Sequence, residues 1–317
     1  MLRLSRDRRG LIGAIIVIVI VVIIVLALLA LIAIPFKEVK INESRQAALG
    51  SGAETLNFSL SADQGSVEVR FVDDAATAVA LTVTGSQRSG LLGGSQPFNM
   101  TWSESTDGSA ITVSSSLKVS SNLGPFSSSK INCTVLISSQ LRTALTITND
   151  LGSVEVQTKS GIELTSANIR TSTGGSRLIM ASNSTLSGPL NMEASLGGID
   201  LQWTDVRATD GASIVLKAST GGVVAKFFQT EPLGTNVTVN TSSNLGGVDL
   251  TVAIQGNNSA RVLSHANLGG VNVGEQIGFN GTSAELTSQN YPAESNFEVS
   301  CEANTGGVNL RLRYAAA

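Results

Sequence analysis

Aromatic side chains and histidine are scarce in this chain of 317 residues. Phe, Trp and Tyr together make up 4% of the sequence, and His265 is the single histidine. Deep ligand pockets and sugar-stacking platforms depend on aromatic rings, so this composition argues against both. One histidine without Cys or Asp around it supplies neither a metal site nor a catalytic triad. We expect His265 to be a surface residue, and we expect no catalytic residue, no metal site and no cofactor.

Basic clusters and cysteines are also few. The net charge is -3, and no basic cluster follows the first nine residues, which argues against nucleic-acid binding. Two cysteines, Cys133 and Cys301, allow one disulfide at most. Strand alternation places both inward, in repeats much farther apart than the roughly 7 Å that a disulfide spans between Cα atoms. We expect two free thiols that pack as small core residues.

One long apolar run stands at the N-terminus. Residues 11–34 carry no charge, follow four arginines within the first nine residues, and end before Pro35. A helix of this length measures about 36 Å, which spans a bilayer. The arginine-rich flank predicts a cytoplasmic N-terminus and an extracytoplasmic C-terminal domain. We therefore expect a single-pass protein of the cell membrane, held in the lipid bilayer through residues 11–34.

The junction at Gly10 has a second interpretation. Arg8, Arg9 and Gly10 precede the unbroken apolar run, and this pattern resembles the class III signal of type IV pilin-like proteins. The resemblance implies processing after Gly10 and assembly into a surface filament through the freed helix. The chain departs from many bacterial pilins at Ile15, where those proteins have glutamate. A filament subunit is therefore the alternative to a permanently anchored protein.

A short glycine motif recurs down the second half of the chain. Its first glycines lie 22 to 25 residues apart except for a last interval of 37, and a period in this range is typical of stacked repeats. These first glycines are Gly152, Gly174, Gly197, Gly221, Gly246, Gly269 and Gly306.

Alignment on the first glycine separates inward from outward columns, because side chains alternate along a strand. Apolar residues recur seven and five positions before the glycine and two and four positions after it, so each repeat should form two strands around a glycine corner. Six positions after it, Trp203 and Phe227 should stack in the core. Four positions before it lies a column of mostly alternating charge, which should be exposed: Arg170, Glu193, Lys217, Ser242, His265 and Glu302.

The pattern predicts an all-β protein, a parallel β-solenoid of about seven or more coils preceded by one transmembrane helix. Gly197, Gly221, Gly246 and Gly269 should be successive corners of one ridge. We expect a cytoplasmic basic segment at 1–10, the transmembrane helix at 11–34, a stalk or linker at 35–55, an irregular β-rich cap or degenerate coils at 56–145, and regular solenoid repeats at 146–317. A cap is expected because terminal coils must cover open strand edges, and residues 64–69 echo residues 151–156.

From Ile131 to Val156 the sequence resembles the start of the repeat in a widespread β-strand-repeat family that is labelled adhesin-like and has no agreed biochemical function. The likeness covers roughly residues 56–312. It implies a surface-exposed β-solenoid that binds or spaces other molecules without catalysis. Expected partners are surface glycans or other cell-surface proteins, and self-association stays open.

Nine Asn-X-Ser/Thr sequons are candidate N-glycosylation sites. They are Asn42, Asn57, Asn99, Asn132, Asn183, Asn236, Asn240, Asn257 and Asn280.

A polysaccharide-active β-helix enzyme is the third interpretation. Asp200 and Asp249 should share an outward column with Val224 between them, which places their backbones about 9 to 10 Å apart. That spacing is near the separation of the two carboxylates in an inverting glycosidase. Because the sequence suggests no Arg or Lys base, aromatic platform or acidic calcium cluster beside them, we expect no enzymatic activity.

Overall fold

The computed structural model describes residues 17–26, 37–89, 98–119, 128–209 and 211–316. This part of the chain is all-β apart from a helix at residues 17–26. Within it, no helix is long and apolar enough to cross a membrane. Ten residues of the expected span at 11–34 are described, and the side chains of Val17 to Leu26 are exposed. Gly10 and the arginines before it lie outside the described residues.

The strands alternate buried and exposed side chains, as the sequence pattern predicts. In chain order they are β1 (Lys37–Ala48), β2 (Thr55–Gln64), β3 (Ser66–Val72), β4 (Thr77–Ser89), β5 (Phe98–Asp107), β6 (Ala110–Val119), β7 (Ser128–Ser138), β8 (Arg142–Leu151), β9 (Val154–Gln157), β10 (Glu163–Thr173), β11 (Ser176–Met180), β12 (Thr185–Leu186), β13 (Pro189–Leu196), β14 (Ile199–Thr204), β15 (Arg207–Ala208), β16 (Ser213–Thr220), β17 (Val223–Gln229), β18 (Val237–Leu245), β19 (Val248–Gln255), β20 (Asn258–Leu268), β21 (Val271–Ile277), β22 (Phe279–Thr282), β23 (Glu285–Ser288), β24 (Ser295–Thr305) and β25 (Val308–Ala315).

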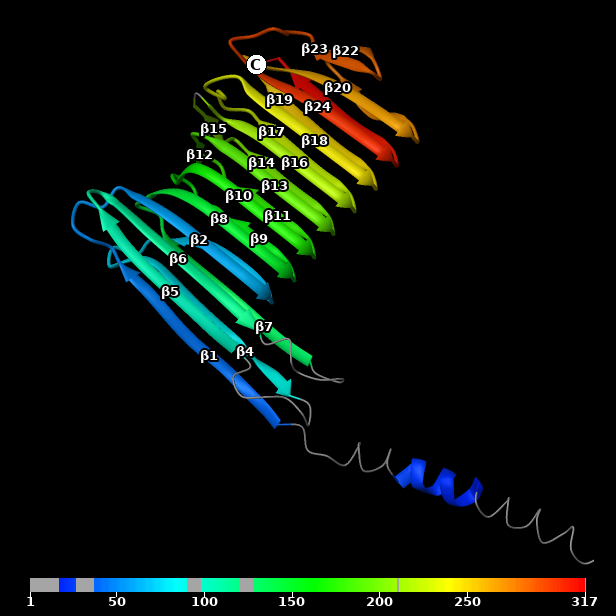
Figure 1. Cartoon of the computed structure of the whole chain (residues 1–317). Coiled ribbons are helices and arrows are strands. Elements are labelled where there is room, and N and C mark those ends of the chain that lie inside the picture. The colour runs from blue at the N-terminus through cyan, green and yellow to red at the C-terminus, as the bar shows by residue number, and fades with distance from the viewer. Residues whose placement is uncertain (1–16, 27–36, 90–97, 120–127, 210, 317) are drawn as a thin grey trace, which may run out of the picture.

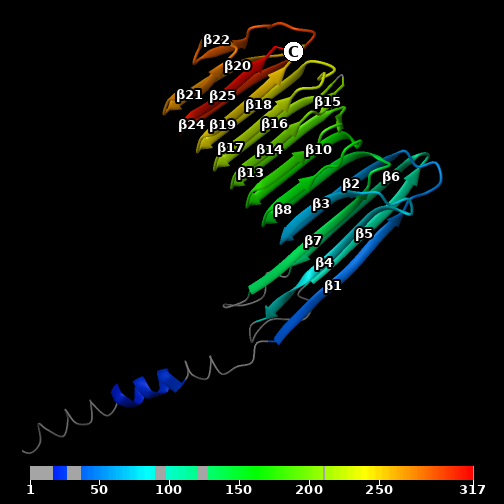
Figure 2. The ribbon, with the colours of Figure 1, turned by 180° about the vertical axis from the view of Figure 1, so that it is seen from behind.

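These strands form two sheets that run side by side along the molecule (Figure 1). Sheet A has eleven strands in the order β1-β4-β7-β3-β9-β11-β14-β17-β19-β25-β21. Sheet B has fourteen, with the main path β22-β23-β20-β24-β18-β16-β13-β10-β8-β2-β6-β5. The chain crosses from sheet B to sheet A at each glycine corner, and the view from behind shows the same continuous stack (Figure 2).

The aligned columns lie opposite one another in neighbouring parallel strands. Leu190 is opposite Ala167 on one side and Ile214 on the other, and Val239 follows Ile214. All four side chains are buried. The expected assignment of inward columns is therefore confirmed.

The first glycine of each pair makes the corner. Gly197 has φ +148°, and a Cβ there would lie 2.1 Å from the carbonyl oxygen of Gly174. Each first glycine meets the corner of the adjacent coil in the same way, so these residues form one ridge. Only glycine combines this backbone angle with so close an approach.

The order of the corners differs from the sequence order at the C-terminal end. Gly306 lies between Gly246 and Gly269, because β24 and β25 insert between the coil of β18 and β19 and the coil of β20 and β21. The expectation that Gly246 and Gly269 are adjacent is wrong. Likewise, Glu302 lies between Ser242 and His265, and not at the end of that column.

The residue types of the two strands favour this insertion. The buried residues of β25 are Val308, Leu310 and Leu312, and the residues opposite them in β21 are Val271, Val273 and the polar Gln276. Placing the more apolar coil inside removes more apolar surface from water. The long last interval supplies the hairpin β22–β23, which pairs antiparallel with β20 and covers part of the open end.

The N-terminal end also departs from expectation. Residues 37–48 lie in the segment expected to be a stalk, but they form β1, which pairs antiparallel with β4 along its length. Four charged residues on this edge strand oppose pairing with another chain, as is common at sheet edges. They are Glu38, Lys40, Glu43 and Arg45.

The two similar segments, residues 64–69 and 151–156, lie in adjacent coils. Val67 lies opposite Val154, and Val69 lies opposite Val156. A Cβ at Gly152 would meet the carbonyl oxygen of Gly65 at 2.1 Å, so the ridge continues into this first coil. Strands β4 to β7 then extend both sheets beyond it.

The core includes an aromatic cluster of Trp203, Phe227 and Phe297, whose ring centroids are 5.3 to 6.1 Å apart. All three are fully buried, and the Trp203 indole Nε1 donates a hydrogen bond of 2.8 Å to the Gln229 side chain. The expected core role of Trp203 and Phe227 is confirmed.

Both cysteines are free and buried, as expected. Cys133 lies in β7, and Cys301 lies in β24 of the coil that includes β25. Seven strand spacings separate β7 from β25 in sheet A, which amounts to about 34 Å.

Candidate functional site

A groove follows the glycine corners across four neighbouring coils. It is open to solvent and has a volume of about 520 Å³. The second glycines Gly175, Gly198 and Gly222 line it, together with Ser153 at the equivalent position of the preceding coil. Outward side chains of sheet A, three positions after each first glycine, add Glu155, Arg177, Asp200 and Val224.

The charged side chains of this groove alternate in sign. Arg177 lies opposite Glu155 on one side and opposite Asp200 on the other. Its Nε is 3.3 Å from Asp200 Oδ2, and both side chains are partly exposed, so the pair adds little stability. The Nε atom of Arg177 and the Oδ1 atom of Asp200 are shielded from water and form no hydrogen bond with the described residues.

Arg177 corrects the expectation that no Arg or Lys lies beside Asp200. It occupies the same column, three residues after Gly174, so extending the alignment by one repeat would have found it. Asp200 and Asp249 are predictable from this column, and so is Arg177 beside Asp200.

Asp200 and Asp249 lie as expected, with Val224 opposite both. Each carboxylate already has a polar neighbour in the adjacent coil: Arg177 for Asp200, and for Asp249 the Asn309 side chain, whose Nδ2 donates a hydrogen bond of 2.7 Å. The absence of catalysis stays a prediction. Among the described residues, no group of three or more His, Cys, Asp or Glu side chains could hold a metal ion.

His265 is exposed, and its Nε2 lies 2.7 Å from the Asn267 side-chain oxygen. Asn267 begins a ladder of amides along the ridge, in which its Nδ2 donates to Asn304 and Asn304 donates to Asn244. The histidine is therefore one member of an exposed polar row.

All nine sequon asparagines are exposed. Asn42 and Asn132 lie in one row of sheet A with Thr84 between them. Asn236 differs from the others in that its side-chain oxygen accepts hydrogen bonds from the backbone and side chain of Asn296. Modification of these asparagines stays a prediction.

A second groove of about 500 Å³ lies at the N-terminal end of the stack, between the edge strands β1 and β5. Its lining combines the apolar side chains of Ile41, Phe98 and Met100 with the sequon residues Asn42 and Asn99. The three apolar side chains point toward the core, and among the described residues no further coil covers β1 and β5.

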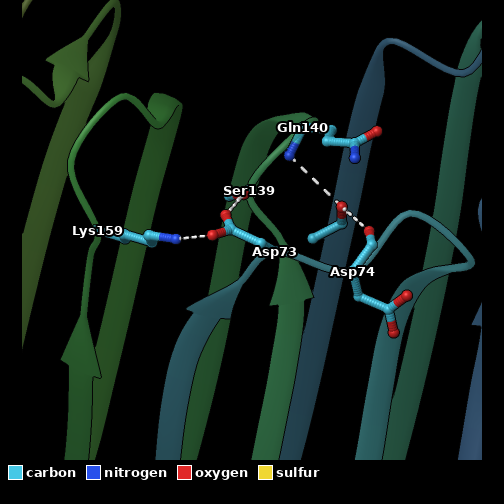
Figure 3. Close-up of polar contacts among 6 residues, drawn as sticks. Asp73, Asp74, Ser139, Gln140 and Lys159 are labelled. Carbon is cyan, nitrogen blue, oxygen red and sulfur yellow. Dashed lines mark hydrogen bonds and ion pairs between the residues drawn. The ribbon is translucent and has the colours of Figure 1, made fainter.

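The loops farthest from the glycine corners are joined by polar contacts (Figure 3). Asp73 forms an ion pair with Lys159 and accepts a hydrogen bond of 2.6 Å from the Ser139 hydroxyl. The hydrogen bond from Lys159, followed by that from Ser139, lowers the pKa of Asp73. Asp74 accepts backbone hydrogen bonds from Ala76 and Thr77, which lower its pKa as well. These contacts link the loops after β3, β7 and β9 and so stabilise the stack.

Comparison with known proteins finds no match in sequence and two weak similarities in structure. No protein-family model and no curated protein sequence matches the chain. A "putative cell adhesion protein" from Clostridium sporogenes is similar in structure, with 13% identity and a TM-score of 0.41 over 87% of this chain and 100% of that chain. A "putative adhesin" from Bacteroides fragilis has 10% identity and a TM-score of 0.28 over 88% of this chain and 100% of that chain. Neither likeness assigns the chain to a family.

Proposed function

We propose that this protein is a membrane-anchored rod of the cell surface, a parallel β-solenoid that works as an adhesin-like binding or structural module without catalysis. One observation carries the proposal. Parallel strands stack in register from β2 and β3 to β20 and β21, so each coil adds one row of outward side chains to a long face. Such a face suits contact with an extended partner better than the enclosure of a small substrate.

The apolar run at 11–34 supports the anchor. Lys37, the first residue of β1, comes three residues after Ile34. A chain of that length reaches at most about 11 Å, so β1 and the N-terminal end of the stack would lie close to the bilayer surface. The remaining coils would then project outward from the membrane.

Membrane extraction tests the anchor. Washing membranes with alkaline carbonate should leave the full-length chain in the pellet, because a spanning helix resists this treatment, and should release a variant that lacks residues 11–34. Release of both proteins would contradict the proposal.

Measuring the intact mass of the mature protein decides whether the chain is cleaved after Gly10. We expect the mature protein to retain residues 1–10. A mass that lacks them would indicate the filament subunit instead.

A further inference from the structure

We propose that the ridge of glycine corners pairs with the same ridge of a second copy of this chain, with the two stacks antiparallel. The inference rests on the proposed function as a rod of the cell surface and names the partner of that rod. Rods that project from two facing membranes meet in this antiparallel orientation, so the second copy stands on the opposite surface.

An exposed column runs along the ridge, one position before each first glycine. Leucine and threonine alternate strictly along it in stack order: Leu151, Thr173, Leu196, Thr220, Leu245, Thr305 and Leu268. The alternation depends on the observed order of the coils, because in chain order Leu268 would follow Leu245 directly.

The fold does not account for these leucines. Each of the four is between 47% and 68% exposed, and threonine fills the same position in the coils between them. Exposed apolar side chains that stand singly are common on protein surfaces, whereas a regular row of them is typical of an interaction surface. The row therefore indicates a partner that also repeats every two coils.

A second copy of the chain has this repeat. Neighbouring coils are about 4.8 Å apart, so the leucines recur about every 9.6 Å with a threonine between them. When two such ridges face each other with an offset of one coil, the leucines of each copy lie over threonines of the other. Large side chains then fill the space beside small ones, as close packing of apolar surfaces requires.

The charges beside the ridge disfavour a parallel pair. A parallel twofold pair brings sheet A of one copy beside sheet B of the other, with equivalent coils at the same height. Arg170 of sheet B then lies beside Arg177 of sheet A, which belongs to the same coil. In the next coil, Glu193 lies beside Asp200. Both contacts join like charges, so the two copies repel each other in this orientation.

An antiparallel twofold pair brings like sheets together, and charge then selects its register. With the twofold axis between the corners Gly197 and Gly221, Glu193 of each copy faces Lys217 of the other. Within the described part of the chain Lys217 forms no ion pair, whereas Glu193 pairs with Arg170. Each of these contacts between opposite charges occurs twice because the pair is symmetric.

Sheet A agrees with this register. Arg177 of one copy faces Asp249 of the other, and Asp249 forms no ion pair within the described part of its own chain, although it accepts a hydrogen bond from Asn309. On the ridge itself, Leu196 lies over Thr220. The next positions outward place Thr173 over Leu245.

Other registers fit less well. Moving the axis one coil toward the C-terminal end of the stack keeps leucine over threonine but sets Glu193 against Glu302. Moving it one coil the other way leaves two leucines of each copy over threonine instead of three. The axis between Gly197 and Gly221 therefore combines the most apolar contact with opposite charges.

The contact is narrow, because one column of leucines and threonines forms its centre. A pair of this size binds weakly by itself, and its strength depends on many copies displayed on each surface. The test therefore traps the pair covalently.

Disulfide trapping in the full-length protein in detergent tests the register. Thr173 of one copy lies over Leu245 of the other, whereas each of these positions is about 14 Å from the same position of the second copy. We expect a mixture of Thr173→Cys and Leu245→Cys proteins to form a linked dimer under mild oxidation, and neither variant to do so alone. Cys133 and Cys301 are buried and should stay unlinked.

Charge exchange tests the faces beside the ridge. Lys217→Glu in both trapping variants sets carboxylates against each other twice, and it should reduce the linked dimer about tenfold. The double exchange Glu193→Lys/Lys217→Glu restores opposite charges and should restore the dimer.

The leucines have a matched control. Leu196→Thr introduces the residue already present in the adjacent coils, so the fold is kept, and the yield of dimer should fall. Leu263→Thr makes the same change at an exposed leucine on the face of sheet B, away from the ridge, and it should leave the yield unchanged.

The placement on facing surfaces is tested with two populations of phosphatidylcholine vesicles, one with each trapping variant. Linked dimers should form between the populations. Dimers in detergent but not between vesicles that retain the protein would overturn this placement.

No linked dimer in the detergent mixture would assign the leucine row to a different partner and overturn the inference. Efficient linking of Thr173→Cys alone, or failure of the double exchange to restore the dimer, would overturn the register. The detergent assay does not depend on membrane topology. Its failure beside retention in carbonate-washed membranes would therefore remove the second copy and leave the surface rod.

Discussion

At the scale of single residues, chemically identical glycines have unequal importance. The first glycine of a pair is fixed by backbone geometry, whereas a Cβ at the second, as at Gly175, would need only a small adjustment of its neighbour. The sequence alone shows both as a repeated Gly-Gly pair. Telling them apart requires the φ angle and the distance to the neighbouring coil, and both depend on how coils stack.

The first prediction compares alanine at the two positions. Gly197→Ala places a Cβ 2.1 Å from the Gly174 carbonyl oxygen at φ +148°, and it should lower the free energy of unfolding by about 3 kcal/mol or more. Gly175→Ala should change it by less than about 1 kcal/mol. Urea unfolding followed by circular dichroism measures both, and equal losses would contradict the distinction.

The second prediction concerns thiol reactivity. Burial raises the pKa of Cys133 and of Cys301 to about 12, so almost no thiolate exists at pH 8 in the folded protein. An alkylating reagent should label neither cysteine in the folded state and both in denaturant without reductant. Zero labels in denaturant, with a linked pair of peptides in the digest, would show that the cysteines are bonded.

The third prediction is a pH dependence. Lys159 and Ser139 hold the pKa of Asp73 below its usual value near 3.8. The stability that these two contacts contribute is therefore present above pH 3.8. It is lost as the pH falls through the lower pKa of the folded state. Lys159→Gln should lower the thermal midpoint slightly at pH 7, and this difference should shrink as the pH falls below 3.8 and Asp73 becomes protonated. A difference that grows in acid would contradict the assignment. Ser160→Ala, next in the chain, serves as control.

At the scale of elements, the sequence predicted which residues face inward but not which coils are neighbours. The columns of Leu190 and Ile214 follow from strand alternation alone. The position of β24 depends on how much apolar surface each coil would expose at the end of the stack, and Val271 and Val308 look equivalent in an alignment. Similarly, the charged segment at 37–48 looked like a stalk because edge strands and linkers share polar composition.

Cross-linking tests the order of coils. Glu302 is opposite Ser242, and His265 lies one strand farther away. The pair Ser242→Cys/Glu302→Cys should therefore form a disulfide under mild oxidation, whereas Ser242→Cys/His265→Cys should not, because about 10 Å separates those Cα atoms. The reverse result would restore the sequence order of the corners.

At the scale of the whole molecule, two parts of the function have different support. The described residues provide the long stacked surface and its groove. The anchor depends on residues 11–34, whose apolar character is plain from the sequence. Of the candidate site, Asp200 and Asp249 could be located in advance because they fall in a repeated column, whereas the groove could not, because it is formed by missing side chains.

The central claim is that the stack of coils is displayed outside a membrane that the N-terminal segment crosses. Protease added to intact cells tests it most directly. Mass spectrometry should show cleavage within residues 37–317, while the segment from Arg3 to Arg9 stays protected until the cells are opened. Protection of the coils in intact cells, with digestion only after lysis, would contradict the claim.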